Sequence, residues 1–481
     1  MSGPGLIAVS IALLAVLLIT VLLRFKNSKD EVLVADRSVG VLVGGLSTAA
    51  AWVWAPALFV SSQKAYENGA AGLFWFAAPN ALALVLFAYI AARARKLLPN
   101  GYTLPEFTRH RLGGTAHKVF MTVEFIVQLY AVIVELIASL LLLRLLTGLN
   151  KSVLLIIVAF LFLAVATTRG IRSTIAVDVV KAVMVAVLGI LVIPLVLGSG
   201  HALSTGLGGL ARTSNPLDPV LIWTFGIPIS ITLLSGITID QQQWQRAFSM
   251  KRATVRRTFL WGALLFAAVP VVLGIPGFIA AGGGSAVKVL DPQLSGFAAI
   301  DAYLPKIGVV VFAFAVLLAL VAAGASALCA AGSVGGVDVF RGYLKPDATD
   351  SQVVAASRLT MVMIVAVGLV VALSPGVQIV YLLLLVGSIR AALMVPTLLA
   401  LFWPRQTSTG ALAGIGSGMV VGLPVFVMGS LMKQTTLQTF GVLLPVVVST
   451  VVTVLVSLRS PQASDLGSLE SAVQQPHEAA R

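Results

Sequence analysis

Charged and chemically reactive side chains are scarce in this sequence. Only 10% of its 481 residues are Asp, Glu, Lys or Arg, and it has one cysteine and four histidines. The single Cys329 excludes an intramolecular disulfide and has no histidine partner that would make it a nucleophile. The histidines fall in predicted loops, at the ends of apolar runs or in the tail: His110, His117, His201 and His477. Neither a metal site nor a Ser–His pair is therefore expected at depth, which argues against an enzyme.

Apolar residues fill most of what remains. They make up 58% of the chain, and the mean hydropathy of +1.02 excludes a soluble domain of this length. Repeated apolar runs of about twenty residues predict an all-α polytopic membrane protein. We expect thirteen spans, at about 5–24, 39–63, 70–92, 119–147, 152–168, 173–198, 217–239, 257–281, 307–336, 356–374, 377–403, 408–432 and 436–458.

Acidic residues are outnumbered by basic ones, 18 against 32, which gives a net charge of +14. Such a charge is compatible with nucleic-acid binding, but in a membrane protein it is typical of the positive-inside rule. Most of the basic residues fall on one side if the first span enters from outside. This predicts an outer N-terminus and a cytoplasmic C-terminus in the plasma (inner) membrane. Residues 1–458 would form one membrane domain with a retained first helix, and 459–481 a disordered tail.

Glycine and proline interrupt two of the expected spans. The stretches are "STAAAWVWAPALF" (47–59) and "FGIPISITLLSG" (225–236). Breaks at matching places in two halves are typical of inverted-repeat transporters, in which unwound backbone lines a central site. The alternative is that Gly and Pro are simply common in membrane helices.

Several longer motifs resemble the sodium:solute symporter family. They are "ADRSVGVLVGGLSTAAAWVWAPALFVSSQKAYENGAAGLFWF", "LPNGYTLPEFTRHRLG", "RGIRSTIAVDVVKAV", "DQQQWQRAFSMK" and "PTLLALFWPRQTSTGALAGIGSGMVVG". They follow one another in the family's order over nearly the whole chain. Within the family, "WVWA", "LFWF" and "DQQQWQRAF" are most similar to the urea-active transporters.

This resemblance implies a leucine-transporter-like core of two inverted five-helix repeats, at about 39–198 and 217–403. One N-terminal and two C-terminal helices would be additional. The resemblance also implies a secondary transporter that moves a small polar solute by alternating access from a site at mid-membrane. Urea or a similar small amide is the expected substrate.

The same resemblance implies a central sodium site, and the sequence departs from it. The family's site would use the backbone carbonyls of Ala50, Val53 and Ala319 together with two hydroxyl side chains. Ala322 and Ala323 stand at those two positions. Because sodium needs several oxygen ligands, the loss of two predicts a sodium-independent carrier. The proton is then the expected coupling ion, with sodium as the alternative.

Two charges lie in the apolar run "STIAVDVVKAVMVAVLGILVIPLVL". Asp178 and Lys181 are three residues apart and so share a helix face. Lys181 lies roughly 13 Å beyond Arg172 along the helix, near the middle of the bilayer. One hypothesis is that its ammonium fills the vacated sodium position, bonds to free carbonyls of the broken second span and titrates during transport, with Asp178 as counter-charge. The other is a static Asp178–Lys181 ion pair.

Aromatic residues occupy the positions that correspond to substrate contacts in the family. They are Trp52, Trp75 and Phe76, with Ala57 among them and Trp54 close by. Aromatic walls suit a small flat solute such as urea, whereas the alternative is contact with lipid or with other helices.

Arg390 lies about thirteen residues from each end of its span, where snorkelling to water is difficult. It is a candidate to clamp a substrate carboxylate, which would indicate a sodium-coupled symporter of a small organic anion or amino acid. The alternative is an ion pair with Glu124 or Glu135.

Asp240 and Gln241 are expected at the cytoplasmic end of the seventh span. They form either an inner gate or a helix end that Trp244 and Arg246 anchor at the interface. The expected partners are a small-molecule substrate and membrane lipids, without nucleic acid, metal or organic cofactor. A transporter-like sensor and a passive channel are the other classes that fit such a chain.

Overall fold

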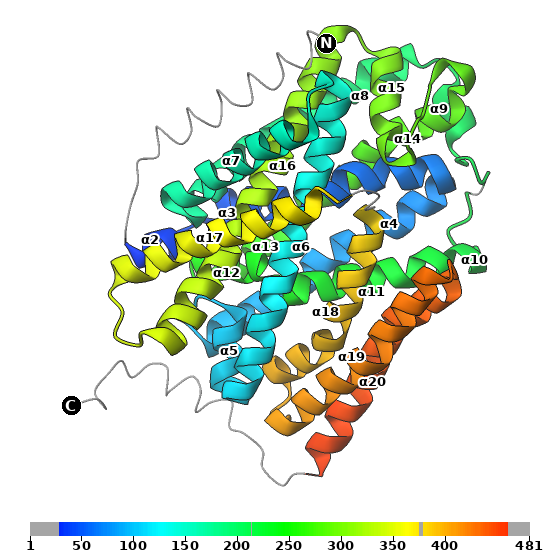
Figure 1. Ribbon diagram of the computed structural model, residues 1–481. Helices are drawn as coiled ribbons and strands as arrows, with labels where there is room; N and C mark the ends of the chain where they lie inside the picture. Colours follow the sequence, from blue (N-terminus) through cyan, green and yellow to red (C-terminus); the bar gives the residue numbers. More distant parts are fainter. Residues whose placement is uncertain (1–27, 213, 375–378, 460–481) are drawn as a thin grey trace.

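The computed structural model describes residues 28–212, 214–374 and 379–459, and in these ranges every regular element is helical. Eleven stretches are long and apolar enough to cross a membrane, and Val41–Ala51 is a shorter apolar helix. The helices, labelled as in Figure 1, are α2 (Lys29–Val34), α3 (Val41–Ala51), α4 (Ala55–Leu97), α5 (Leu104–Leu112), α6 (Gly114–Thr147), α7 (Lys151–Arg169), α8 (Ile171–Gly198), α9 (Ala202–Gly206), α10 (Pro219–Leu221), α11 (Ile227–Ile239), α12 (Gln241–Ser249), α13 (Val255–Ala267), α14 (Val269–Gly282), α15 (Ser295–Tyr303), α16 (Lys306–Ser333), α17 (Asp350–Ala372), α18 (Ile379–Phe402), α19 (Ser408–Leu431) and α20 (Thr435–Leu458).

The long helices confirm the membrane spans that hydropathy predicts from 119 onward, whereas the expected spans at 39–63 and 70–92 are divided differently, into the short α3 and the long α4. Most observed ends lie within a few residues of the expected ones, although α16 continues through a π-helical segment, Val334–Leu344. The expected first span at 5–24 and the tail from residue 460 lie outside the described residues. The total of thirteen spans and the repeat symmetry therefore stay predictions.

The second expected span is broken at the tryptophans, as the sequence indicates. α3 ends at Ala51, and α4 begins at Ala55 with Pro56 in its first turn, where a missing N–H costs no helical hydrogen bond. α4 then continues into the third expected span through a kink at Gly69. This residue has φ +61°, and an added Cβ would lie 2.4 Å from the carbonyl carbon of Gly208. Only glycine fits both the conformation and the space.

The seventh span is broken at a different place from the one predicted. Residues 225–236 stay helical, passing from a π-helical segment (Ile222–Gly226) into α11. The interruption falls at Asp240, whose backbone is extended and whose side chain accepts the N–H of Gln242 to begin α12. Gly and Pro are tolerated in the helix, whereas an N-capping aspartate starts a new one.

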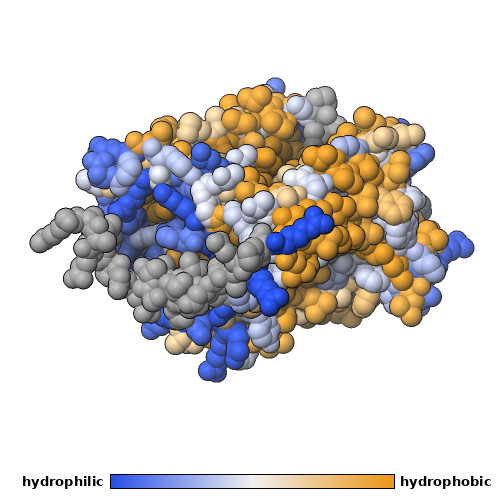
Figure 2. Space-filling model, turned by 90° about the horizontal axis from the view of Figure 1, so that it is seen from below, coloured by the Kyte–Doolittle hydropathy of each residue, from blue (hydrophilic) through white to orange (hydrophobic). Residues whose placement is uncertain are grey.

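The two breaks lie inside the molecule because the most buried helices surround them. α6 and α16 are largely enclosed by the others, whereas α8, α19 and α20 expose much of their apolar surface. α19 and α20 pack side by side at one edge, next to α18 (Figure 1). Seen from below, hydrophobic residues cover a broad continuous area, and hydrophilic residues gather towards one side (Figure 2). A surface of this kind is that of a multi-pass integral membrane protein.

Candidate functional site

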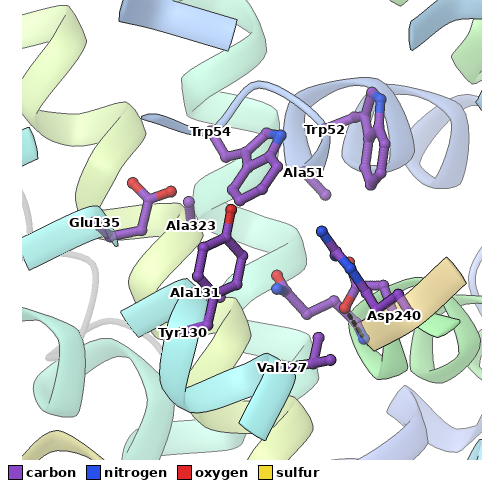
Figure 3. A pocket seen from close by; sticks show the side chains of 11 residues that line it. Ala51, Trp52, Trp54, Val127, Tyr130, Ala131, Glu135, Asp240 and Ala323 are labelled. Carbon is purple, nitrogen blue, oxygen red and sulfur yellow. Dashed lines mark hydrogen bonds between the residues drawn. The ribbon is translucent and has the colours of Figure 1, made fainter. Parts of the chain in front are cut away.

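The two breaks meet at one small internal cavity of about 20 Å³. Its walls come from the α3–α4 break, from α6, from the α11–α12 break, from α16 and from α18 (Figure 3). The lining residues are Ala51, Trp52, Trp54, Val127, Tyr130, Ala131, Glu135, Asp240, Gln242, Ala323 and Arg390.

Aromatic rings form one wall of this cavity. The ring centroids of Trp52 and Trp54 are 6.2 Å apart, and Tyr130 meets Trp54 edge-on at 6.1 Å. The hydroxyl of Tyr130 points toward the ring of Trp54 (Figure 3). The guanidinium carbon of Arg390 lies 5.6 Å from the centre of the Tyr130 ring, a cation–π distance. The cavity therefore combines flat apolar surfaces with a fixed positive charge.

Four polar atoms of the lining residues are buried without a hydrogen-bond partner in the described part of the chain. They are Trp52 Nε1, Tyr130 Oη, Glu135 Oε2 and Arg390 Nε. An unsatisfied buried polar group costs roughly 1–3 kcal/mol, so such atoms are rare unless a ligand or water meets them. These four atoms leave hydrogen-bonding capacity in the cavity for a polar solute or for water.

Glu135 joins the cavity to the start of α4. Its Oε1 accepts the backbone N–H of Ala55 at 3.0 Å, which satisfies one of the free N–H groups at a helix N-terminus. In Figure 3 its carboxylate lies beside Ala323, which also lines the cavity. The sequence interpretation treated Glu135 only as a possible partner of Arg390. A carboxylate within an apolar helix is by itself a functional signal that would have singled it out.

Asp178 has a different partner from the one either hypothesis assumed. Its Oδ2 accepts hydrogen bonds from Ser47 Oγ at 2.7 Å and from Arg246 Nη2 at 2.8 Å. Arg246 also donates to Ser326 Oγ at 2.9 Å and is buried, so it does not anchor a helix at the membrane surface. The static Asp178–Lys181 ion pair is therefore absent, and Asp178 pairs with Arg246 instead of Lys181.

Lys181 is completely buried, as its position in the span predicts. Its Nζ has no hydrogen-bond partner within residues 28–212, 214–374 and 379–459, so the expected bonds to free carbonyls of the second span are not formed. Glu135 and Asp178 are the acids that act electrostatically on it. A buried ammonium without hydrogen bonds needs these nearby negative charges to remain ionised.

The structure divides the residues of the expected sodium site between two cavities and the core. Ala323 lines the central cavity, whereas Ala50 and Val53 line a separate apolar cavity of about 330 Å³ beside α8, α13 and α14. The carbonyl of Ala50 already accepts the N–H of Val53 at 2.9 Å. Ala319 and Ala322 are buried in α16 and contribute no side-chain oxygen.

Three of the expected substrate contacts lie away from the central cavity. Trp75 donates through Nε1 to the carbonyl of Pro216 at 2.7 Å, and its ring covers Gly226. Phe76 and Ala57 are packed in the core and line no part of the cavity. Trp52, Trp54 and Arg390 are the predicted contacts that the structure brings together.

Arg390 does not form the ion pair that the sequence suggested. Among the described residues, no carboxylate oxygen, including those of Glu124 and Glu135, lies within 4.0 Å of its guanidinium nitrogens. It packs instead against Gly236, where an added Cβ would lie 3.3 Å from Nη1, and over Tyr130. Its charge is thus available to the cavity.

Asp240 and Gln241 are buried inside the molecule. Asp240 directly follows the end of α11 and lines the cavity itself. The Gln241 amide accepts the N–H of Leu104 at 2.9 Å and donates to the carbonyl of Tyr102 and to Ser333 Oγ, both at 3.0 Å. Gln241 therefore ties the second break to the segment before α5 and to the end of α16.

The order of these elements agrees with a known family of proteins. A model described as the sodium:solute symporter family matches residues 33–422. The chain belongs to the sodium:solute symporter family. Membership in this family of symporters places it among transporters rather than enzymes.

Several curated proteins are similar in sequence to this chain. The chain is 24% identical over 470 residues to the "Urea-proton symporter DUR3" of Oryza sativa subsp. japonica, covering 87% of this chain and 64% of that protein. It is 22% identical to the "Probable urea active transporter 1" of Schizosaccharomyces pombe, over 87% of this chain and 68% of the relative. The "Urea active transporter" of Saccharomyces cerevisiae is 22% identical over 85% of this chain and 60% of its own length. The chain thus spans about two thirds or less of these proteins.

Solved transporter structures share the fold. A substrate-bound, outward-open Na⁺-coupled sialic acid symporter aligns with a TM-score of 0.79 and 15% identity, over 96% of this chain and 98% of that chain. Mhp1, described as a nucleobase-cation-symport-1 family transporter in a closed conformation, aligns with a TM-score of 0.61 and 14% identity, over 92% and 97%. At these identities the likeness concerns the fold alone.

Proposed function

We propose that this chain is a secondary active transporter of urea or a similar small amide, which it moves by alternating access through the central cavity. The observation that carries this proposal is the set of unpartnered polar atoms around that cavity. The curated relatives, which are named as urea transporters, support the same substrate class.

The chemistry of urea complements these atoms. Its carbonyl oxygen accepts hydrogen bonds, and Trp52 Nε1 and Arg390 Nε are donors that have no acceptor among the described residues. Its two amino groups donate, for which Glu135 Oε2 and the oxygen of Tyr130 are acceptors. A flat molecule also packs against the rings of the aromatic wall. Because about 10–15 Å³ holds one water, a cavity of about 20 Å³ favours a solute of very few atoms over a sugar.

We propose that transport is independent of sodium and coupled to protons. Ala322 and Ala323 remove two hydroxyl ligands, and Lys181 supplies a buried amine on which Asp178 and Glu135 act electrostatically, which would replace the charge of the ion. The protein would lie in the plasma (inner) membrane with its N-terminus outside and its C-terminus in the cytoplasm, because its basic residues concentrate on one side.

The test is uptake of labelled urea into proteoliposomes of the purified chain, with an imposed pH gradient, a sodium gradient, or neither. We expect accumulation with the pH gradient and no further effect of sodium. Lys181→Ala should lower the rate at least about tenfold, since it leaves Glu135 without its balancing charge. The exposed Lys306→Ala serves as the matched control and should behave as the wild type. Uptake that requires sodium, or an unchanged uptake rate in Lys181→Ala, would contradict this assignment.

One observation favours a second candidate substrate class. The Arg390 guanidinium reaches the cavity without a carboxylate partner among the described residues, which suits a small organic anion or an amino acid with sodium as the coupling ion. The same proteoliposomes decide between the two. Inhibition of urea uptake by acetate or glycine, but not by acetamide, together with sodium dependence, would favour the anion carrier.

A further inference from the structure

Beside the cavity, two buried carboxylates share a single amide. Gln128 Nε2 donates to Glu124 Oε2 and to Asp240 Oδ1, each at 3.2 Å. The shared donor places these two oxygens within about 6.4 Å of each other. Glu124 is fully buried on α6, and Asp240 lies at the α11–α12 break with little exposure. Two carboxylates this close in an apolar interior do not both ionise without positive charge nearby.

The positive charges around the pair are too few to balance it. Arg390 acts electrostatically on both carboxylates, and Arg246 acts on Asp240. Arg246, however, is already held by Asp178 through a hydrogen-bonded ion pair. Glu124 and Asp240 therefore share the single charge of Arg390, which lies over the Tyr130 ring and within 4.0 Å of neither carboxylate. One negative charge remains uncompensated if both acids are ionised.

Two buried oxygen atoms at this pair lack a hydrogen-bond donor within the described structure. Glu124 Oε1 and Gln128 Oε1 are both buried, and neither has a hydrogen-bond partner in the described ranges. Both are acceptors as long as Glu124 is ionised. A proton on Glu124 Oε1 would convert this acceptor into a donor and remove one of the two unmet needs for a donor.

We infer that Glu124 and Asp240 hold one proton between them, and that this proton is the one coupled to movement of the solute. The inference rests on the proposed function for the coupling, whereas the bound proton stands on the geometry alone. Asp240 faces the cavity, so solute there contacts one member of the pair. When the site opens to the other side, the O–H bond of the acid breaks, the proton passes to water, and the pair is left with one more negative charge.

Gln241 connects the pair to the segment before α5. Its backbone N–H donates to Glu124 Oε2 at 3.3 Å, and its side chain reaches the Tyr102 carbonyl. Next to Tyr102 lies a cavity of about 530 Å³ lined by Glu106, Arg109, Asp338 and Arg341 among others. Burial, followed by the charge of Asp338, raises the pKa of Glu106 to about 7. A carboxyl with this pKa exchanges protons near neutral pH.

The bound proton is tested on the purified full chain without any solute. Infrared spectra are recorded from pH 5 to 9, and the carbonyl stretch of a protonated buried carboxylic acid is followed. We expect this band in the wild type at neutral pH and a clear decrease of it in Glu124→Gln combined with Asp240→Asn, with Glu106, whose pKa is raised to about 7, accounting for part of what remains. The matched control is Glu67→Gln, because Glu67 is ion-paired with Lys64 at 2.5 Å and should contribute no such band. An undiminished band in the double variant would overturn the inference.

The coupling is tested in proteoliposomes with Glu124→Gln alone, since glutamine keeps the shape of a protonated glutamate. We expect exchange of labelled for unlabelled urea to persist, while accumulation driven by the pH gradient falls at least tenfold, to the level without a gradient. Thermal unfolding confirms that the variant is folded, and Asp240→Asn provides a second variant of the same pair. Gradient-driven accumulation equal to that of the wild type would overturn the coupling role. A wild type that moves no urea would refute the proposed function, while the infrared band would still decide on the proton.

Discussion

At the scale of single residues, Trp54 occupies the centre of the aromatic wall. It contacts Trp52 on one side and the edge of Tyr130 on the other. Trp54→Ala removes the surface against which a flat amide packs, and aromatic contacts of this kind are worth about 0.5–1.5 kcal/mol beyond area burial. We therefore expect the KM for urea to rise roughly three- to tenfold in Trp54→Ala, measured by initial uptake rates.

Trp75→Phe is the matched control for this prediction. Trp75 is also a tryptophan of a membrane helix, but its Nε1 bonds to Pro216 and its ring lies on Gly226, outside the cavity. Its replacement should leave the KM for urea near the wild-type value. Equal effects of the two variants would show that the solute does not bind at the wall formed by Trp54.

The burial of Asp178 and Lys181 could be predicted from the sequence, but their interaction partners could not. Their spacing correctly puts both charges in a buried part of one helix, because helical periodicity and hydropathy are local properties. Their partners are not local. Arg246 comes from α12 and Glu135 from α6, and only the packing of these helices on α8 decides which charge meets which.

At the scale of elements, the close contact between α14 and α4 requires glycine at position 277. A Cβ added to Gly277 would lie 2.0 Å from the backbone oxygen of Ser62, and backbone cannot give way as a flexible side chain does. Gly277→Ala should therefore separate the two helices and lower the free energy of unfolding by about 1–3 kcal/mol. The measurement is thermal unfolding in detergent.

Gly416 in α19 is the matched control for this substitution, since nothing lies within 4 Å of an added Cβ there. Gly416→Ala should be neutral or stabilising by up to about 1 kcal/mol, because alanine favours the helix. If Gly277→Ala is as stable as Gly416→Ala, the close approach of α14 and α4 is not required for folding.

The two helix breaks differ in how well the local sequence predicts them. Trp54-Ala55-Pro56 could be recognised as a helix restart because Pro56 fits the first turn. The second break was predicted too early, at Gly and Pro residues that the helix tolerates. Asp240 acts as an N-cap only because the chain leaves the helical path there, which local composition does not require.

At the scale of the whole molecule, Glu106 couples folding to pH. It begins α5, where its carboxylate accepts the N–H of Tyr102 at 2.7 Å and its own N–H donates to Thr103 Oγ1. Burial and the charge of Asp338 raise its pKa from 4.5 to about 7. The folded state thus binds this proton more tightly than the unfolded state, and the stability that it contributes is lost as pH rises from about 4.5 through about 7.

Glu106→Gln removes this dependence while keeping an acceptor for Tyr102. We expect the variant to gain about 1–2 kcal/mol in stability relative to the wild type between pH 5 and pH 8. The readout is the difference in melting temperature at the two pH values. Glu67→Gln is the control, and it should leave the difference in melting temperature between the two pH values unchanged. Parallel pH profiles of Glu106→Gln and the wild type would contradict the assignment.

The amino-acid sequence alone determined the membrane class, the positions of most spans, the first break and the family. All of these follow from hydropathy, periodicity and ordered motifs, which depend on residues close together in the chain. Only the tertiary structure decided that Tyr130, Glu135 and Asp240 line one cavity, that Trp75 does not, and that Arg246 pairs with Asp178. The reason is physical. Buried polar atoms need hydrogen-bond partners. These partners often lie on helices that are far apart in the sequence and become neighbours only when the helices pack.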